Sequence, residues 1–147
     1  MDIETRTQLV ETVRRFAQEK LRPLEREVSE TDDIPLWVQK EMAALGLFGL
    51  SIPEEHGGLG LSMEEECLVV FELGGVSPAF RSTIGTNVGI GSQGLVMFGT
   101  DAQKERYLPK IATGEIVTSF ALTEPEAGSD SASVRTSARL DGAHYVL

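Results

Sequence analysis

The sequence of 147 residues holds a single cysteine, Cys67, and its aromatic residues make up only 6% of the chain. One cysteine can form neither an internal disulfide nor a paired-cysteine metal clip, which fits a reducing compartment. Free cysteines are usually small apolar fillers, and we expect that role for Cys67 on a helix. His56 and His144 stand far apart without clustered ligand residues, so the sequence does not indicate a metal site.

Long apolar runs and excess positive charge are also missing. No apolar run approaches the roughly 20 residues that cross a bilayer, and the charged N-terminus has no apolar stretch of the kind a secretory signal needs. We therefore expect a cytoplasmic protein without membrane insertion. Lys and Arg number 13 against 23 Asp and Glu, a formal net charge of −10. This charge repels phosphate backbones, which disfavours nucleic acid as a partner.

The first part of the chain has the apolar spacing of helices. Apolar residues recur every three or four positions from Thr5 to Ser29, which predicts a long amphipathic helix with an interruption at Pro23. A second helix is expected from Pro35 to Leu45, ended by a glycine in the left-handed conformation. Trp37 on this helix is expected to pack in the core.

Two later helices carry an N-terminal signature. Ser62 with Glu65, and Thr100 with Gln103, match the capping box, in which the two side chains cap each other's backbone N–H groups. Pro109 is expected to interrupt the second of these helices, because proline removes a helical hydrogen bond. The apolar residues expected to face the core here are Met63, Cys67, Val70, Phe71, Phe98 and Tyr107.

Gly89, Gly91 and Gly94 spell G-x-G-x-x-G, which can cradle the pyrophosphate of a dinucleotide when it follows a buried strand and opens a long helix. The preceding residues are polar, and only 95–99 remain before the next helix cap. An acid about twenty positions on, Glu115, precedes the next strand instead of ending it. We therefore disfavour a Rossmann site and expect these glycines to permit close helix packing or tight turns.

After Gly114 the pattern changes from helix to strand. Residues 116–122 form a β-prone run, which a turn-rich stretch closes. A second alternating stretch, 133–140, leads through the turn residues 141–142 into residues 144–147. Because the sequence stops within an expected strand, we expect it to be part of a longer polypeptide.

These patterns together predict a mainly α fold. We expect an orthogonal or up-down N-terminal domain of five or six helices over residues 1–114. Residues 115–147 are expected to form the first strands of a second, β-barrel-like domain.

The stretch FALTEPEAGSD, Phe120 to Asp130, places a strand, a hydroxyl, an acid, a proline and a glycine-serine loop in order. By residue type alone its second part is a polar turn. The whole stretch resembles the flavin-binding signature of the acyl-CoA dehydrogenase family, with an aromatic, Thr-Glu-Pro and Ala-Gly-Ser-Asp. Residues 52–62 and 98–115 resemble the same family in its order and spacing, so the resemblance covers essentially the whole chain.

The resemblance implies that FAD is the cofactor and that residues 120–129, beginning with Phe120, line it. Leu122 and Thr123 would offer backbone and hydroxyl hydrogen bonds to the pyrimidine side of the isoalloxazine, where negative charge develops as a hydride is accepted. Gly128 would let the backbone approach, and Ser129 would contact the pyrophosphate or the thioester substrate. These residues are the predicted cofactor site.

The resemblance also implies the family's reaction, the oxidation of an acyl-CoA to the trans-2-enoyl-CoA in fatty-acid β-oxidation. Electron-transfer flavoprotein would be the acceptor, and the parent protein would be a homotetramer or homodimer. In the family the carboxylate base lies beyond the position of Leu147, so we assign no catalytic residue here. Glu124 is interpreted as a structural partner or loop cap, and we decline Asp130 as a base. Residues 1–147 alone are expected neither to hold FAD tightly nor to turn over substrate.

Two alternatives stay open at this point. Acyl-CoA oxidases and flavin monooxygenases share the family's scaffold but pass electrons to oxygen. The second alternative is a non-catalytic helical interaction module that has inherited the FALTEPEAGSD stretch.

Overall fold

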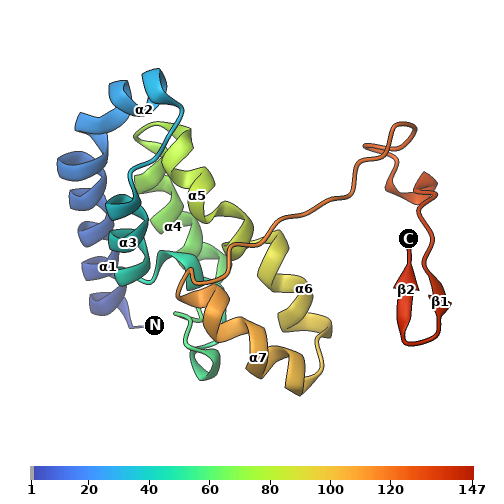
Figure 1. Ribbon diagram of the computed structural model, residues 1–147. Coiled ribbons are helices and arrows are strands. Elements are labelled where there is room, and N and C mark those ends of the chain that lie inside the picture. The colour runs from blue at the N-terminus through green and yellow to red at the C-terminus, as the bar shows by residue number, and fades with distance from the viewer. Residues whose placement is uncertain (1) are drawn as a thin grey trace.

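The computed structural model describes residues 2–147. Seven α-helices pack into one helical body, and the chain then leaves it as an extended segment that ends in a small hairpin (Figure 1). The mainly α fold class predicted from the sequence is confirmed. The helices are α1 (Ile3–Phe16), α2 (Glu25–Thr31), α3 (Leu36–Ala44), α4 (Met63–Gly74), α5 (Pro78–Val88), α6 (Ile90–Phe98) and α7 (Asp101–Ala112), and the strands are β1 (Arg139–Asp141) and β2 (His144–Val146).

Helices α1 and α2 form one helical path that changes its winding before Pro23. A π-helical segment, Ala17–Leu21, and a 3₁₀ turn, Arg22–Leu24, connect them. Proline lacks an N–H and crowds the preceding turn, so the regular α-helical ladder cannot pass through it. The buried face continues through the irregularity, since Ala17 and Leu21 are fully buried. The interruption predicted at this proline is confirmed.

The helix ends follow the sequence closely. In both predicted capping boxes the two side chains cap each other's backbone N–H groups. For example, the Thr100 N–H donates to Gln103 Oε1 at 2.9 Å, and the Gln103 N–H donates to Thr100 Oγ1 at 3.3 Å. Gly46 follows α3 with φ of 74°, the left-handed conformation that was predicted. Pro109, however, lies inside α7, which continues to Ala112, so the interruption predicted there is wrong.

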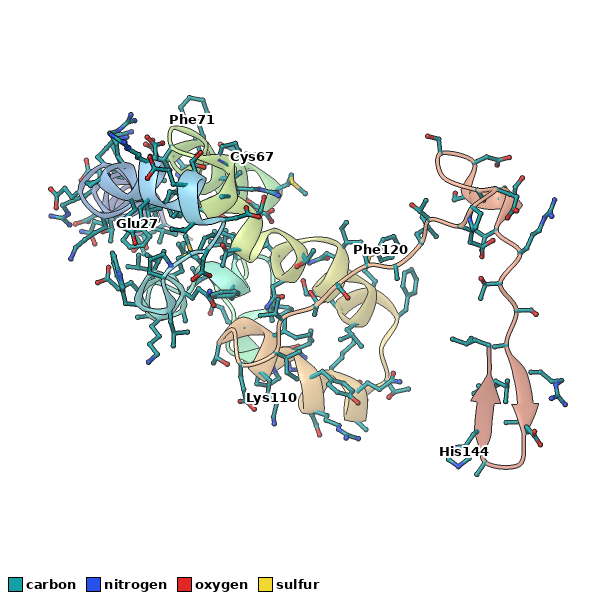
Figure 2. The ribbon with its side chains drawn as sticks, turned by 45° about the horizontal axis from the view of Figure 1, so that its top comes forward. Glu27, Cys67, Phe71, Lys110, Phe120 and His144 are labelled. Atoms are coloured by element: carbon teal, nitrogen blue, oxygen red, sulfur yellow. The ribbon has the colours of Figure 1, made fainter. Side chains whose placement is uncertain are left out.

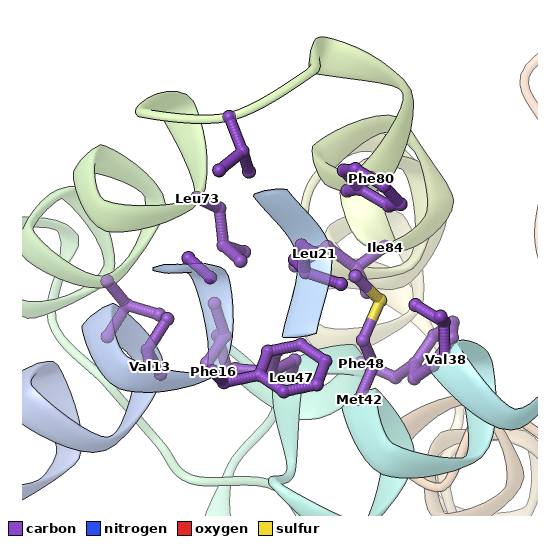
Figure 3. Close-up of a cluster of buried hydrophobic side chains, with 14 of the residues drawn as sticks. Val13, Phe16, Leu21, Val38, Met42, Leu47, Phe48, Leu73, Phe80 and Ile84 are labelled. Atoms are coloured by element: carbon purple, nitrogen blue, oxygen red, sulfur yellow. The ribbon is translucent and has the colours of Figure 1, made fainter. Parts of the chain in front are cut away.

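The main hydrophobic core lies between α1, α3, α4 and α5 (Figure 3). Its fully buried side chains include Val13 of α1, Met42 of α3, Leu73 of α4 and Phe80 of α5. Removing such a side chain from water stabilises the fold by about 1.5–3 kcal/mol. A smaller cluster packs α7 against the loop after α3 and consists of Ile52, Leu108, Ile111 and Ala112. Burial of residues 108, 111 and 112 explains why α7 persists through its proline.

Several residues predicted to lie in the core are exposed. On α4 the exposed residues are Met63, Cys67 and Phe71, whereas Val69 and Leu73 are buried. Apolar residues occupy most of the circumference of the second half of α4, so spacing alone could not select the buried face. Trp37 and Phe98 are also exposed, so their predicted core positions are wrong as well, while Tyr107 is half-buried against the smaller cluster.

The strand predicted over residues 116–122 is not formed. The chain is extended there, but among residues 2–147 it has no partner strand, and a β-ladder needs one. The predicted turn at Asp141 and Gly142 is confirmed, because β1 and β2 pair antiparallel across it with Leu140 opposite Tyr145. Gly142 takes a positive φ of 62° in that turn. None of the described helices is long and apolar enough to span a membrane.

Candidate functional site

The segment that leads to the candidate site is fastened to the helical body by one buried side chain, Asn87 of α5. Its Nδ2 donates to the carbonyl of Ile111 at 3.1 Å and to the carbonyl of Ile116 at 2.8 Å. Its Oδ1 accepts from the backbone N–H of Thr118 at 2.8 Å and from the Thr118 hydroxyl at 3.0 Å. We call these four residues the Asn87 clasp. They join α5, the end of α7 and the outgoing chain.

One glycine of the G-x-G-x-x-G motif packs against this clasp. A Cβ on Gly91 would overlap the side chain of Thr118 and approach the carbonyl oxygen of Thr86 to 2.8 Å. The predicted role in close packing is therefore confirmed at Gly91. Gly89 stands at the junction of α5 and α6, while a Cβ on Gly94 would meet nothing within 4 Å, so Gly94 has no packing role.

Glu124 organises the loop that follows Thr123 and carries two of the five predicted cofactor residues, Gly128 and Ser129. Its carboxylate accepts from the backbone N–H groups of Arg135 and Thr136, each at 2.8 Å. Its own backbone exchanges two hydrogen bonds with the buried Ala127, at 2.9 Å and 3.2 Å. Hydrogen bonding from Thr136, and then from Arg135, lowers the pKa of this carboxyl below its usual value. The interpretation of Glu124 as a structural partner is confirmed.

Asp130 closes the other end of the loop. Its Oδ2 accepts from the Ser133 hydroxyl at 2.6 Å, and its carbonyl accepts from the Ser133 backbone N–H at 3.1 Å. These bonds start the 3₁₀ turn Ser131–Ser133. Both acids that could have suggested a general base thus serve the local structure of the loop.

The five predicted cofactor residues lie on the surface of the extended segment and its loop. Phe120 is 57% exposed and Leu122 is 39% exposed, and Figure 2 shows Phe120 on the strand-like stretch between the helical body and the loop. Thr123, Gly128 and Ser129 are exposed as well. The loop brings two of them together, because a Cβ on Gly128 would lie 4.0 Å from Thr123 Cγ2.

The hydrogen-bonding groups of these residues are available to a ligand. Within residues 2–147, no hydrogen bond engages the backbone N–H of Leu122 or Thr123, or the hydroxyls of Thr123 and Ser129. Gly128 leaves open space around its backbone. The segment thus presents unengaged donors beside an apolar side chain and an open glycine.

Sequence reasoning missed the Asn87 clasp. A usable signal was present, because Asn87 lies between the apolar residues Ile84 and Val88 on a helix face that is buried. A polar side chain on such a face must have hydrogen-bond partners. The sequence could not show which residues provide those partners, since they lie 24 to 31 positions after Asn87 along the chain.

Comparison with known proteins decides the family. The sequence pattern of the acyl-CoA dehydrogenase N-terminal domain matches residues 3–115. This chain belongs to the acyl-CoA dehydrogenase family. It is 44% identical to the human very long-chain specific acyl-CoA dehydrogenase, mitochondrial, over 131 residues, which are 89% of this chain and 20% of the human protein. The resemblance inferred from the sequence is therefore confirmed.

Two solved structures have the same fold over nearly the whole chain. An acyl-CoA dehydrogenase from Bacillus anthracis, complexed with FAD, superposes with a TM-score of 0.84 at 37% identity, covering 99% of this chain and 25% of that one. A structure from work on the electron transferring flavoprotein of Acidaminococcus fermentans gives a TM-score of 0.88 at 34% identity, covering 99% of this chain and 39% of that one. The chain thus spans less than two fifths of the length of these two solved chains.

Proposed function

We propose that this chain forms part of an FAD-dependent acyl-CoA dehydrogenase, an oxidoreductase that converts acyl-CoA thioesters to trans-2-enoyl-CoA in fatty-acid β-oxidation. One observation carries the proposal: the backbone N–H groups of Leu122 and Thr123 are exposed and unengaged in a family member whose solved relative is complexed with FAD. Membership of the family supports the reaction class, and the unengaged donors support a cofactor site on this segment.

The five predicted cofactor residues would each have a role in binding FAD. The N–H groups of Leu122 and Thr123, with the Thr123 hydroxyl, would donate to the pyrimidine edge of the ring and so favour the negative charge that develops there. Phe120 would line the cofactor, Gly128 would let the backbone approach it, and Ser129 would donate to the pyrophosphate or to the thioester carbonyl. FAD, when bound, supplies the acceptor for the substrate's β hydrogen.

We assign no catalytic base to this chain. Glu124 and Asp130 each follow a proposed cofactor residue directly in sequence. Glu124 accepts two backbone N–H groups, which lower its pKa, and Asp130 accepts from the Ser133 hydroxyl. A general base works best with a pKa near the working pH, and the bonds to Glu124 lower its pKa away from that value. In the proposed enzyme the base comes from another part of the parent polypeptide, so residues 1–147 supply one wall of the site.

Acyl-CoA and an electron-transfer flavoprotein are the proposed substrate and electron acceptor. The likeness to a structure from work on an electron transferring flavoprotein supports the second partner. A parent homotetramer or homodimer and the division of the chain into domains at 1–114 and 115–147 belong to the same proposal. The cytoplasmic location stays a prediction of the sequence, and the human relative is mitochondrial by its name.

The test uses the complete parent polypeptide, purified and examined for flavin absorbance before and after anaerobic addition of acyl-CoA esters of different chain lengths. The proposal predicts stoichiometric flavin whose absorbance is bleached by at least one ester, with slow reoxidation by air. Fast reoxidation would instead identify an oxidase or monooxygenase. A protein without flavin would indicate an interaction module and contradict the proposal.

A further inference from the structure

The Asn87 clasp is the last hydrogen-bonded attachment of the chain to the helical body before the proposed flavin segment. After Thr118, the described residues 119–123 make no hydrogen bond to any other part of the chain. The next internal bonds are those of the Glu124 loop, which are local. The flavin segment therefore starts from Thr118, the last of these residues that is bonded to the helical body.

The distance from the clasp to the proposed cofactor residues is short. Phe120 is two residues beyond Thr118, and Thr123 is five residues beyond it. An extended chain advances at most about 3.3–3.6 Å per residue. Thr123 therefore lies within about 18 Å of Thr118, so the clasp is the nearest bonded point of the helical body, along the chain, to the donors of Leu122 and Thr123.

The Asn87 side chain needs several hydrogen-bond partners at once, and this requirement favours one arrangement of the outgoing chain. The buried carboxamide of Asn87 uses both of its ends, donating to two carbonyls and accepting from two donors of Thr118. A buried polar group without partners costs about 1–3 kcal/mol, so the amide strongly favours this one arrangement of the outgoing chain. Gly91 supports it by leaving room for the Thr118 side chain.

We propose that Asn87 and Gly91 are positioning residues for the cofactor: together they seat Thr118 and thereby place the Leu122 and Thr123 donors against the flavin. This inference rests on the proposed function and extends it to two residues of the helical body that do not touch the ring. Their effect passes through the main chain from Thr118 to Thr123.

The test compares variants of the complete flavoprotein. Asn87→Ala removes all four bonds of the clasp, and Gly91→Ala displaces Thr118 without touching Asn87. Gly94→Ala is the matched control, because it adds the same methyl group on the same helix into open space. The double variant Gly91→Ala with Thr118→Gly removes the side chain that the new methyl group would strike, while the backbone N–H at 118 remains.

The readouts are the dissociation constant of FAD, the flavin absorption spectrum and the flavin midpoint potential. Asn87→Ala and Gly91→Ala are expected to weaken FAD binding about tenfold and to shift the spectrum and potential. Gly94→Ala is expected to match the wild type, and the double variant is expected to recover part of the affinity. A purely structural role would not move the flavin potential in a variant that keeps its thermal stability.

A second readout needs no cofactor. In residues 1–147 alone, amide hydrogen exchange at Thr118 reports whether the clasp is intact, and this exchange is expected to accelerate in Asn87→Ala.

If Asn87→Ala fails to fold, the comparison of Gly91→Ala with Gly94→Ala and the double variant decides whether the clasp positions the cofactor. Flavin affinity, spectrum and potential equal to the control, with faster exchange at Thr118, would overturn this inference alone. A wild-type protein without flavin would overturn the proposed function and this inference with it, while the exchange experiment would still report the clasp.

Discussion

Glu124 holds a loop closed with its side chain, while the nearby Thr123 and Ser129 keep hydroxyls that make no hydrogen bond within residues 2–147. It stands one residue after Thr123, yet its carboxylate bonds backbone N–H groups 11 and 12 residues further along. The loop between is closed on itself, and Gly128 and Ser129 in it are exposed. A residue type that first suggests catalysis thus has a structural role here.

Replacing Glu124 by alanine should open the loop. The N–H groups of Arg135 and Thr136 lose their acceptor, so we expect their amide hydrogens to exchange with solvent at rates near those of an unstructured chain. Glu126→Ala is the matched control, because Glu126 is exposed in the same loop and no hydrogen bond engages it. NMR-detected exchange measures both variants. Unchanged protection in Glu124→Ala would show that the carboxylate does not hold the loop.

The same bonds give the loop a dependence on pH. Because the pKa of Glu124 is lowered in the folded loop, its contribution is fully present above the usual glutamate pKa of about 4.3. It is lost as the pH falls through the lower, folded value. Exchange protection at Arg135 and Thr136, after correction for intrinsic rates, should therefore fall as the solution is acidified below about pH 4. In Glu124→Gln this acid transition should disappear.

At the scale of whole elements, the sequence predicted helix ends better than helix faces. The capping boxes of α4 and α7 depend on residues three positions apart, which the sequence shows directly. The buried face of α4 depends on which neighbour it packs against. Arg14 of α1 bonds Glu72 of α4 at 2.8 Å and 3.0 Å, and this pairing accompanies burial of Leu73 instead of Phe71.

Two phenylalanines on neighbouring helices test this assignment of faces. Phe80 of α5 is fully buried, whereas Phe71 of α4 is 79% exposed. Phe80→Ala should lower the free energy of unfolding by about 3–5 kcal/mol, because it leaves a cavity in the core. Phe71→Ala should change it by less than about 0.5 kcal/mol. Chemical denaturation of residues 1–147 measures both, and equal losses would show that the face of α4 is assigned wrongly.

For the whole molecule, the mainly α class and the family resemblance followed from the sequence, because both depend on local spacing and on contiguous motifs. The unpaired state of residues 116–122 did not, since β propensity describes a strand only where a partner exists. The candidate cofactor residues were predicted from one motif, whereas Asn87 was missed because its partners are distant in sequence.

The exposure of the proposed site leads to a prediction for residues 1–147 alone. Phe120, Thr123 and Ser129 present one exposed edge and no enclosing wall, and ligand sites usually enclose most of the ligand's surface. We expect this chain to purify without a stoichiometric flavin absorbance band, in contrast to the complete parent polypeptide. A stable yellow complex of residues 1–147 would contradict the view that they form only one wall of the site.

The most direct measurement is a crystal structure of the complete parent polypeptide with FAD bound. The account predicts that the backbone nitrogens of Leu122 and Thr123 lie at hydrogen-bond distance, about 3 Å, from acceptor atoms on the pyrimidine edge of the isoalloxazine. FAD bound at another segment, or those two N–H groups bonded within the protein, would contradict it.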